Sequence, residues 1–226
     1  PVRPAPHEPG RGGPLNAALA TRRLGREDIV VVAATTLAAG LAWTWLAGGG
    51  GLAMAAMMAS PWSPTYLVPA FTMWALMMVA MMLPSALRMI LLHAPVARQG
   101  GGATLPAGTA VFALAYVLLW GGFALLAAVA QAAPVASGAL SAMELAVGDR
   151  LLAAGLLMLA AIYQVSTVKR ACLDKCRSPL EFLVRGFAPG WRASLRLGLA
   201  HGVFCIGCCW ALMALLFVGG GVNLAW

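Results

Sequence analysis

Charged residues are scarce in this chain of 226 residues. Only 10% of the residues are charged and 62% are hydrophobic, whereas an average soluble domain is about 25% charged. A single soluble core of this length cannot bury so much apolar surface, so a soluble enzyme is excluded. The glycines follow no three-residue period, which excludes collagen, and the low charge excludes a disordered chain. The composition therefore predicts a membrane protein.

Acidic residues are the scarcer kind of charge, with seven against fifteen Lys and Arg, which gives a net charge of +8. Such a balance is also found in nucleic-acid-binding proteins. In a chain as apolar as this one, clustered cations instead mark the cytoplasmic side of a membrane, so no nucleic-acid partner is expected. P-loop, GxSxG, zincin and dinucleotide-binding motifs are all absent from the sequence.

Five apolar stretches are long enough to cross a bilayer, which takes about 20 helical residues. They cover residues 28–47, 66–87, 107–130, 151–168 and 197–218. They are rich in Ala, Leu and Met and do not alternate with polar residues, as strands would. The sequence therefore predicts an all-α transmembrane bundle of five spans. The final residues 223–226 look like the start of a sixth helix that is cut off.

The cations predict the orientation of the spans. Fourteen of the fifteen lie before the first span, after the second, or between the fourth and the fifth. This pattern predicts a multi-pass protein of the bacterial inner (plasma) membrane with a cytoplasmic N-terminus. Residues 1–27 are expected to be a disordered basic arm, and residues 28–226 the bundle, with a cytoplasmic basic loop at 169–196.

The second span is unusually rich in methionine. Its methionines are Met73, Met77, Met78, Met81 and Met82. The first, second and fourth of these share one helical face, because residues three or four positions apart lie above one another. Thioethers suit Cu(I), although methionine also fills gaps between packed helices.

The fifth span carries one histidine and three cysteines. His201, Cys205 and Cys208 are spaced by four and then three residues, so they share a face, and Cys209 lies at its edge. A histidine inside a span is costly unless it is paired or functional. Buried cysteines are often inert, but three within five residues of one another favour a metal or redox site.

The methionine and cysteine faces are expected at similar depths. At 1.5 Å per residue, Cys205 lies about 13 Å from Arg196, and Met81 and Met77 lie about 10 and 16 Å from Arg88. The two faces would meet if the second and fifth spans were neighbours.

A second pair of cysteines, Cys172 and Cys176, is spaced by four residues and shares a face if the fourth span continues as a helix. On the predicted cytoplasmic side a structural disulfide is disfavoured, which leaves metal capture, thiol exchange or no role.

Two other features concern helix packing and the membrane interface. Gly198, Gly202 and Gly207 would let a neighbouring helix approach closely. Arg88 and His93, near the end of the second span, are expected to reach the membrane interface.

Several stretches together resemble the bacterial "predicted metal-binding integral membrane protein" family, a domain of unknown function. They are residues 73–85, 163–164, 169–172, 176–180, 201–202, 205–210 and 223–226. The resemblance implies an inner-membrane helical protein with a soft-metal site. The matching positions are Met77, Met81, Cys172, Cys176, His201, Cys205, Cys208 and Cys209.

We therefore expect a membrane protein that binds a soft transition metal, copper first, for metal handling or delivery. Another transition metal is an alternative, since imidazole tolerates several. Besides the lipid bilayer, the partner would be another subunit or a metallochaperone. Two further functions stay open: a subunit of a metal-dependent membrane oxidase or monooxygenase, and a thiol/quinone redox protein. In a third alternative, the methionines and cysteines only pack a scaffold.

Overall fold

The computed structural model describes residues 25–48, 58–99, 105–140, 147–186 and 188–219. Its helices are α2 (Arg26–Ala47), α4 (Pro64–Gln99), α5 (Leu105–Ala136), α6 (Arg150–Gln164), α7 (Thr167–Arg177), α8 (Pro179–Gly186), α9 (Trp191–Ala214) and α10 (Leu216–Gly219). Within these ranges the only strand-type pairing is an isolated bridge between Leu140 and Val147. The predicted all-α bundle of long apolar helices is confirmed. The predicted arm up to residue 24 and the predicted sixth helix lie outside the described residues.

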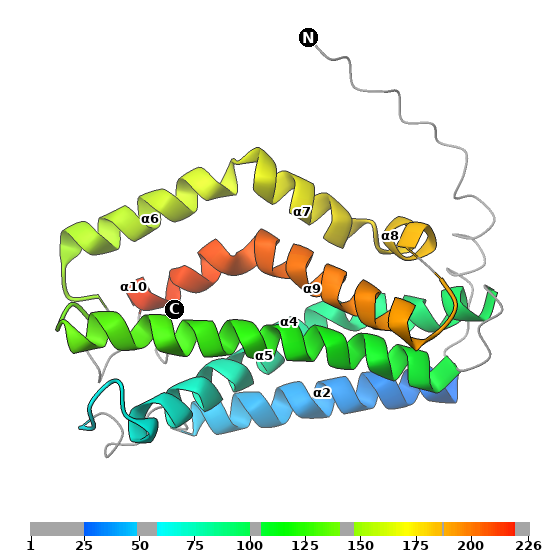
Figure 1. Cartoon of the computed structure of the whole chain (residues 1–226), viewed down its shortest axis with the longest axis horizontal. Helices are drawn as coiled ribbons and strands as arrows, with labels where there is room; N and C mark the ends of the chain where they lie inside the picture. Colours follow the sequence, from blue (N-terminus) through cyan, green and yellow to red (C-terminus); the bar gives the residue numbers. More distant parts are fainter. Residues whose placement is uncertain (1–24, 49–57, 100–104, 141–146, 187, 220–226) are drawn as a thin grey trace, which may run out of the picture.

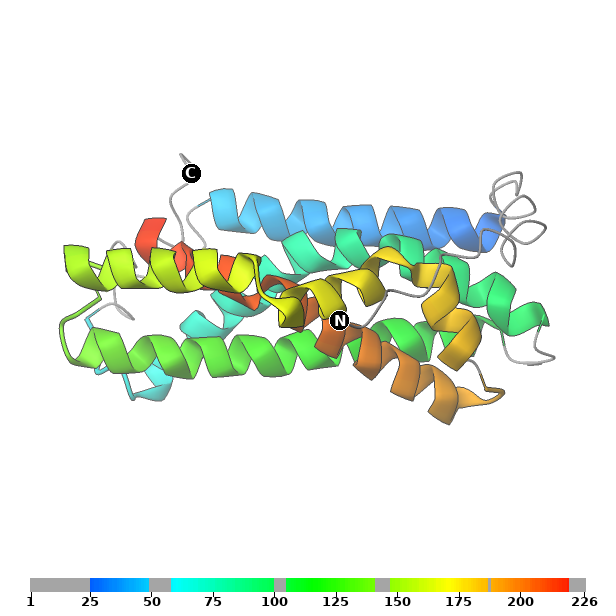
Figure 2. The same cartoon turned by 90° about the horizontal axis from the view of Figure 1, so that it is seen from above.

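Helix α5 is central to the bundle. It packs along α4 on one side and along α9 on the other, and α2 packs against α4. Helices α6 and α7 form a bent arch over α9 (Figure 1). The long helices all follow the long axis of the molecule (Figure 2). One end of the bundle, where α2, α5 and α9 begin and α4 ends, is called the basic end below.

The fourth predicted span differs from the expectation of one continuous helix. Four helices are long and apolar enough to cross a membrane alone, and α6 with α7 makes a fifth only as a pair bent by 61°. The break has a local cause, because the hydroxyl of Ser166 accepts a hydrogen bond from the backbone N–H of Lys169 and so caps a new helix. Beside the break, Tyr163 donates a hydrogen bond to the carbonyl of Gly207. The predicted basic loop is mostly helical, since it contains α8 and most of α7.

The predicted close approach at glycines of α9 is confirmed. A Cβ atom at Gly198 would collide with the carbonyl oxygen of Phe112 and lie 2.8 Å from the Cβ of Ala115. A Cβ at Gly202 would lie 2.6 Å from a methyl of Leu119. These two glycines therefore let α9 lie against the backbone of α5, which sets the position of the residues between and beyond them.

Candidate metal centre

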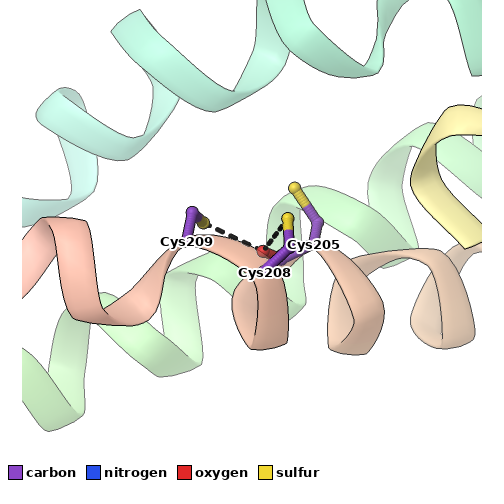
Figure 3. Close-up of side chains that lie close together, drawn as sticks. All are labelled: Cys205, Cys208 and Cys209. Atoms are coloured by element: carbon purple, nitrogen blue, oxygen red, sulfur yellow. Dashed lines mark hydrogen bonds between the residues drawn. The ribbon is translucent and has the colours of Figure 1, made fainter. Parts of the chain in front are cut away.

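Three thiols of α9 lie together inside the bundle. The Sγ atoms of Cys205, Cys208 and Cys209 all lie within 4.8 Å of one another. Cys208 and Cys209 each donate a hydrogen bond from Sγ to the carbonyl oxygen of Cys205, at 3.1 and 2.9 Å (Figure 3). The Sγ atoms of Cys205 and Cys208 point toward the side on which α4 runs (Figure 3). A metal about 2.3 Å from each thiolate needs sulfurs about 4 Å apart, so small side-chain rotations suffice for this trio to bind one.

His201 lies one helical turn from Cys205 and is 5% exposed. Its ring stacks on the rings of Phe112 and Tyr116, with centroids 6.1 and 5.3 Å away. Phe182 of α8 lies against it from another side, at 6.1 Å. Three aromatic rings from two other helices therefore hold the imidazole in place one turn from Cys205, and its nitrogens are not among the ligand atoms that lie within 4.8 Å of one another.

Helix α7 brings two more thiols to the same place. Cys176 lies close enough to Cys205 and Cys208 to interact with both. Cys172 packs against α9, because a Cβ at Gly207 would lie only 2.7 Å from its Sγ. Gly207 thus lets α7 lie close to α9, as predicted, with the thiol of Cys172 against it. All five cysteines of the chain are free thiols, and the bend between α6 and α7 gathers them around one turn of α9.

The methionines lie in the core of the bundle. Met73 and Met77 are 1% and 5% exposed, and Met81 packs against the same core while partly exposed. The second and fifth predicted spans correspond to α4 and α9. Among the described residues these two helices do not pack extensively against each other, and α5 packs against both. Helix α5 therefore contacts both the helix with the methionine face and the helix with the cysteine face.

Tyr116 of α5 connects the methionine helix α4 with the cysteine helix α9. The sequence analysis did not identify this residue. The residue is 1% exposed. Its hydroxyl donates a hydrogen bond to the carbonyl oxygen of Met82, 3.0 Å away, and lies 3.4 Å from the Sγ of Cys205. The available signal was a single tyrosine in the middle of an apolar span, because a buried hydroxyl usually has a hydrogen-bond partner.

The prediction that His93 reaches the membrane interface is wrong. The side chain is 1% exposed, its Nδ1 lies 3.1 Å from the Oγ1 of Thr109, and its ring stacks on Phe112 at 5.0 Å. Within the described part of the chain its Nε2 has no hydrogen-bond partner. Phe112 thus lies between the two buried histidines of the described chain, His93 and His201.

Comparisons with known proteins bear on the same residues. A family model described as "PpoB2: Copper chaperone" matches residues 71–226, more than half of the chain. The matched range contains every residue of the candidate site. It supports a copper-related family, as expected, but not the particular family named from the resemblance. Comparisons with curated proteins and with solved structures gave no match.

Proposed function

The chain belongs to the PpoB2 copper chaperone family, and we propose that it binds copper inside its helical bundle and delivers it to a partner protein. The ligands in this proposal are Cys205, Cys208, Cys209 and His201 of α9. Cys172 and Cys176 of α7 take up the ion where it enters the bundle. Met77 and Met81 of α4 receive it from the cysteines on its way to the partner protein.

The observation that carries the proposal is the gathering of soft donors at one place around α9, with Cys205 buried and the other thiols partly buried. Three thiols lie within 4.8 Å of one another, and a fourth, from Cys176, lies within interaction distance of two of them. Thiolates and thioethers favour Cu(I) over hard cations such as Mg²⁺. A scaffold has no need for this arrangement, because cysteines that only fill space need not converge on one point.

Two helices supply the thiols, which suits an ion that has to move. Cys205, Cys208 and Cys209 lie on a helix fixed against α5, whereas Cys172 and Cys176 lie on an 11-residue helix that follows a bend. Ligands from two elements can be exchanged one at a time, so the ion never becomes free. The thiol protons lost on binding are released, which makes copper binding weaker at low pH.

The methionine face extends the site along α4. Tyr116 places Cys205 at the level of Met82. Met81 lies about 1.5 Å along the helix axis from that level, and Met77 and Met73 follow at intervals of about 6 Å, toward the end of the bundle opposite the basic end. A ladder of thioethers in this position provides weak, exchangeable ligands along the direction of delivery.

The membrane and orientation follow from the charge pattern. We propose that the protein lies in the bacterial inner membrane with the basic end toward the cytoplasm. Copper then enters beside α7 and leaves through the methionine face to a partner on the other side. The lipid-facing surface carries many exposed apolar side chains, among them Leu118, Leu126 and Ile162, as a bilayer requires.

The test is elemental analysis of the detergent-purified chain after loading with Cu(I). The wild type is expected to retain near-stoichiometric copper, and a Cys205→Ser/Cys208→Ser double variant is expected to lose it. Met158→Leu is the matched control, because Met158 is 63% exposed on α6 and away from the thiols. Equal copper content in the wild type and the double variant would overturn the proposal.

Delivery is tested separately with the loaded protein. A chaperone is expected to give its copper to a Cu(I) chelator without consuming oxygen. Oxygen-dependent turnover of an apolar substrate by the loaded protein would instead indicate the oxidase alternative, and electron transfer to a quinone without copper the thiol-redox alternative.

A further inference from the structure

A charged cavity lies between α7, α8 and α9, outside the candidate metal centre. Its volume is about 560 Å³, within the range of small-molecule sites. The charged side chains that line it are Asp174, Lys175, Glu181, Arg185 and Arg196. Glu181 and Arg185 form an ion pair at 2.9 Å. Among the described residues the other three have no ion pair, so two cations and one carboxylate are available to a ligand.

One side chain of the cavity wall, Phe182, lies against His201. Phe182 lines the cavity, and its ring lies 6.1 Å from the ring of His201. Phe204 lines the cavity next to it, at 6.0 Å and edge to face. Rotation of Phe182 would therefore connect the cavity with the imidazole.

Helix α7 connects the cavity with the thiols in a second way. Asp174, Lys175 and Ser178 of this helix line the cavity. Cys176, on the same turn, lies instead beside Cys205 and Cys208. A ligand in the cavity would thus lie against the same turn of α7 that carries Cys176.

We propose that this cavity binds the small thiol peptide that brings Cu(I) to the protein, a tripeptide of the glutathione type. This inference rests on the proposed function. Cu(I) is carried by thiolates, and glutathione maintains the thiol pool of the cytosol. Glutathione has two carboxylates and one ammonium group, which match Lys175, Arg196 and Asp174. A zwitterionic lipid headgroup has one anionic and one cationic group and would leave one of the two cations without a partner.

The transfer is a ligand exchange without a change of oxidation state. The bond between Cu(I) and the thiolate of the carrier breaks, and a bond between Cu(I) and the Sγ of Cys176 forms. The proton of the Cys176 thiol moves to the leaving thiolate, so the carrier departs as a neutral thiol. Exchange from Cys176 to Cys205 and Cys208 completes the loading.

The experiment uses the full chain in nanodiscs and two double variants. Lys175→Ala/Arg196→Ala removes both available cations of the cavity, and Arg177→Ala/Arg192→Ala removes two cations of the same helices that do not line it. Binding of metal-free reduced glutathione is measured by calorimetry, and loading from Cu(I)–glutathione is followed by stopped-flow. The cavity variant is expected to bind glutathione about tenfold more weakly and to load about tenfold more slowly, as the loss of two solvent-exposed ion pairs implies. The control is expected to stay within about twofold of the wild type.

Three results would overturn the inference. One is equal loading rates in the cavity variant and the control. Another is binding of metal-free glutathione by the cavity variant as tightly as by the wild type. The third is displacement of glutathione by glycerophosphoethanolamine at equal concentration, which would identify a lipid-headgroup site. Failure of the proposed function is distinguishable, because the wild type would then take up no copper from any source.

Discussion

The hydroxyl of Tyr116 lies 3.4 Å from the Sγ of Cys205 and donates a hydrogen bond to the carbonyl oxygen of Met82 at 3.0 Å. One side chain of α5 therefore touches α4 and α9, two of the three helices that carry the candidate copper ligands. Because the Tyr116 hydroxyl donates its proton to the hydrogen bond with the Met82 carbonyl, its oxygen accepts a hydrogen bond from the Cys205 thiol. When Cys205 becomes a thiolate, the hydroxyl can turn and donate to the sulfur, which favours the metal-bound form.

Tyr116→Phe is expected to weaken copper binding by about tenfold, the usual effect of removing a group that hydrogen-bonds to a ligand. Competition with a Cu(I) chelator measures the affinity. Tyr66→Phe is the control, since the hydroxyl of Tyr66 accepts a hydrogen bond from Gln131 in a separate buried network. Equal losses in the two variants would mean that Tyr116 acts only through stability.

Two histidines are buried in the described chain, and we assign a ligand role to His201 alone. His201→Phe keeps a ring against Phe112 and Tyr116 and removes the nitrogens, so copper affinity should fall at least tenfold. His93→Phe keeps the stacking on Phe112 and should leave the affinity within about twofold. X-ray absorption of each loaded variant shows whether a nitrogen ligand is lost. A larger loss of copper affinity in the His93 variant than in the His201 variant would contradict this assignment.

The thioethers of α4 are expected to act in delivery. Met77→Leu/Met81→Leu conserves volume, so it should cost less than about 1.5 kcal/mol of stability per site. It should slow the release of copper to an external chelator while the Cys-bound copper content stays near that of the wild type. Met158→Leu should release copper at the wild-type rate. Identical release from both variants would show that the methionines only pack the core.

The glycines of α9 set the contact with α5. Gly198→Ala should destabilise the protein by about 1–3 kcal/mol, because the new methyl group collides with the backbone of Phe112. Gly40→Ala is the control: nothing lies within 4 Å of its Cβ position, and the change should be neutral or stabilise by up to about 1 kcal/mol. Thermal unfolding in detergent measures both. A Gly198 variant as stable as the control would contradict the close packing of α9 on α5.

The sequence predicts the helices well but not how they meet. Apolar length and Met- and Ala-rich composition predict α2, α4, α5 and α9 to within a few turns. The break at Ser166 was missed, because an apolar run followed by charged residues looks like one span with a loop after it. The hydrogen bond from Lys169 to the Ser166 hydroxyl shows instead that a second helix starts there.

The candidate site was predicted residue by residue but not as an arrangement. Spacing alone places His201, Cys205 and Cys208 on one face. Counting residues placed Cys205 between Met81 and Met77 in depth, and the structure places it at the level of Met82. The partners of Tyr116 and the burial of His93 could not be predicted, because both depend on residues of another helix.

The most direct test of the account is X-ray absorption at the copper edge on the loaded wild type and on Cys205→Ser/Cys208→Ser. The account predicts sulfur ligands at about 2.3 Å, the usual metal–thiolate distance, with copper in the Cu(I) state, and loss of this sulfur shell in the variant. A spectrum with nitrogen and oxygen ligands alone, or an unchanged sulfur shell in the variant, would contradict a copper centre built on α9.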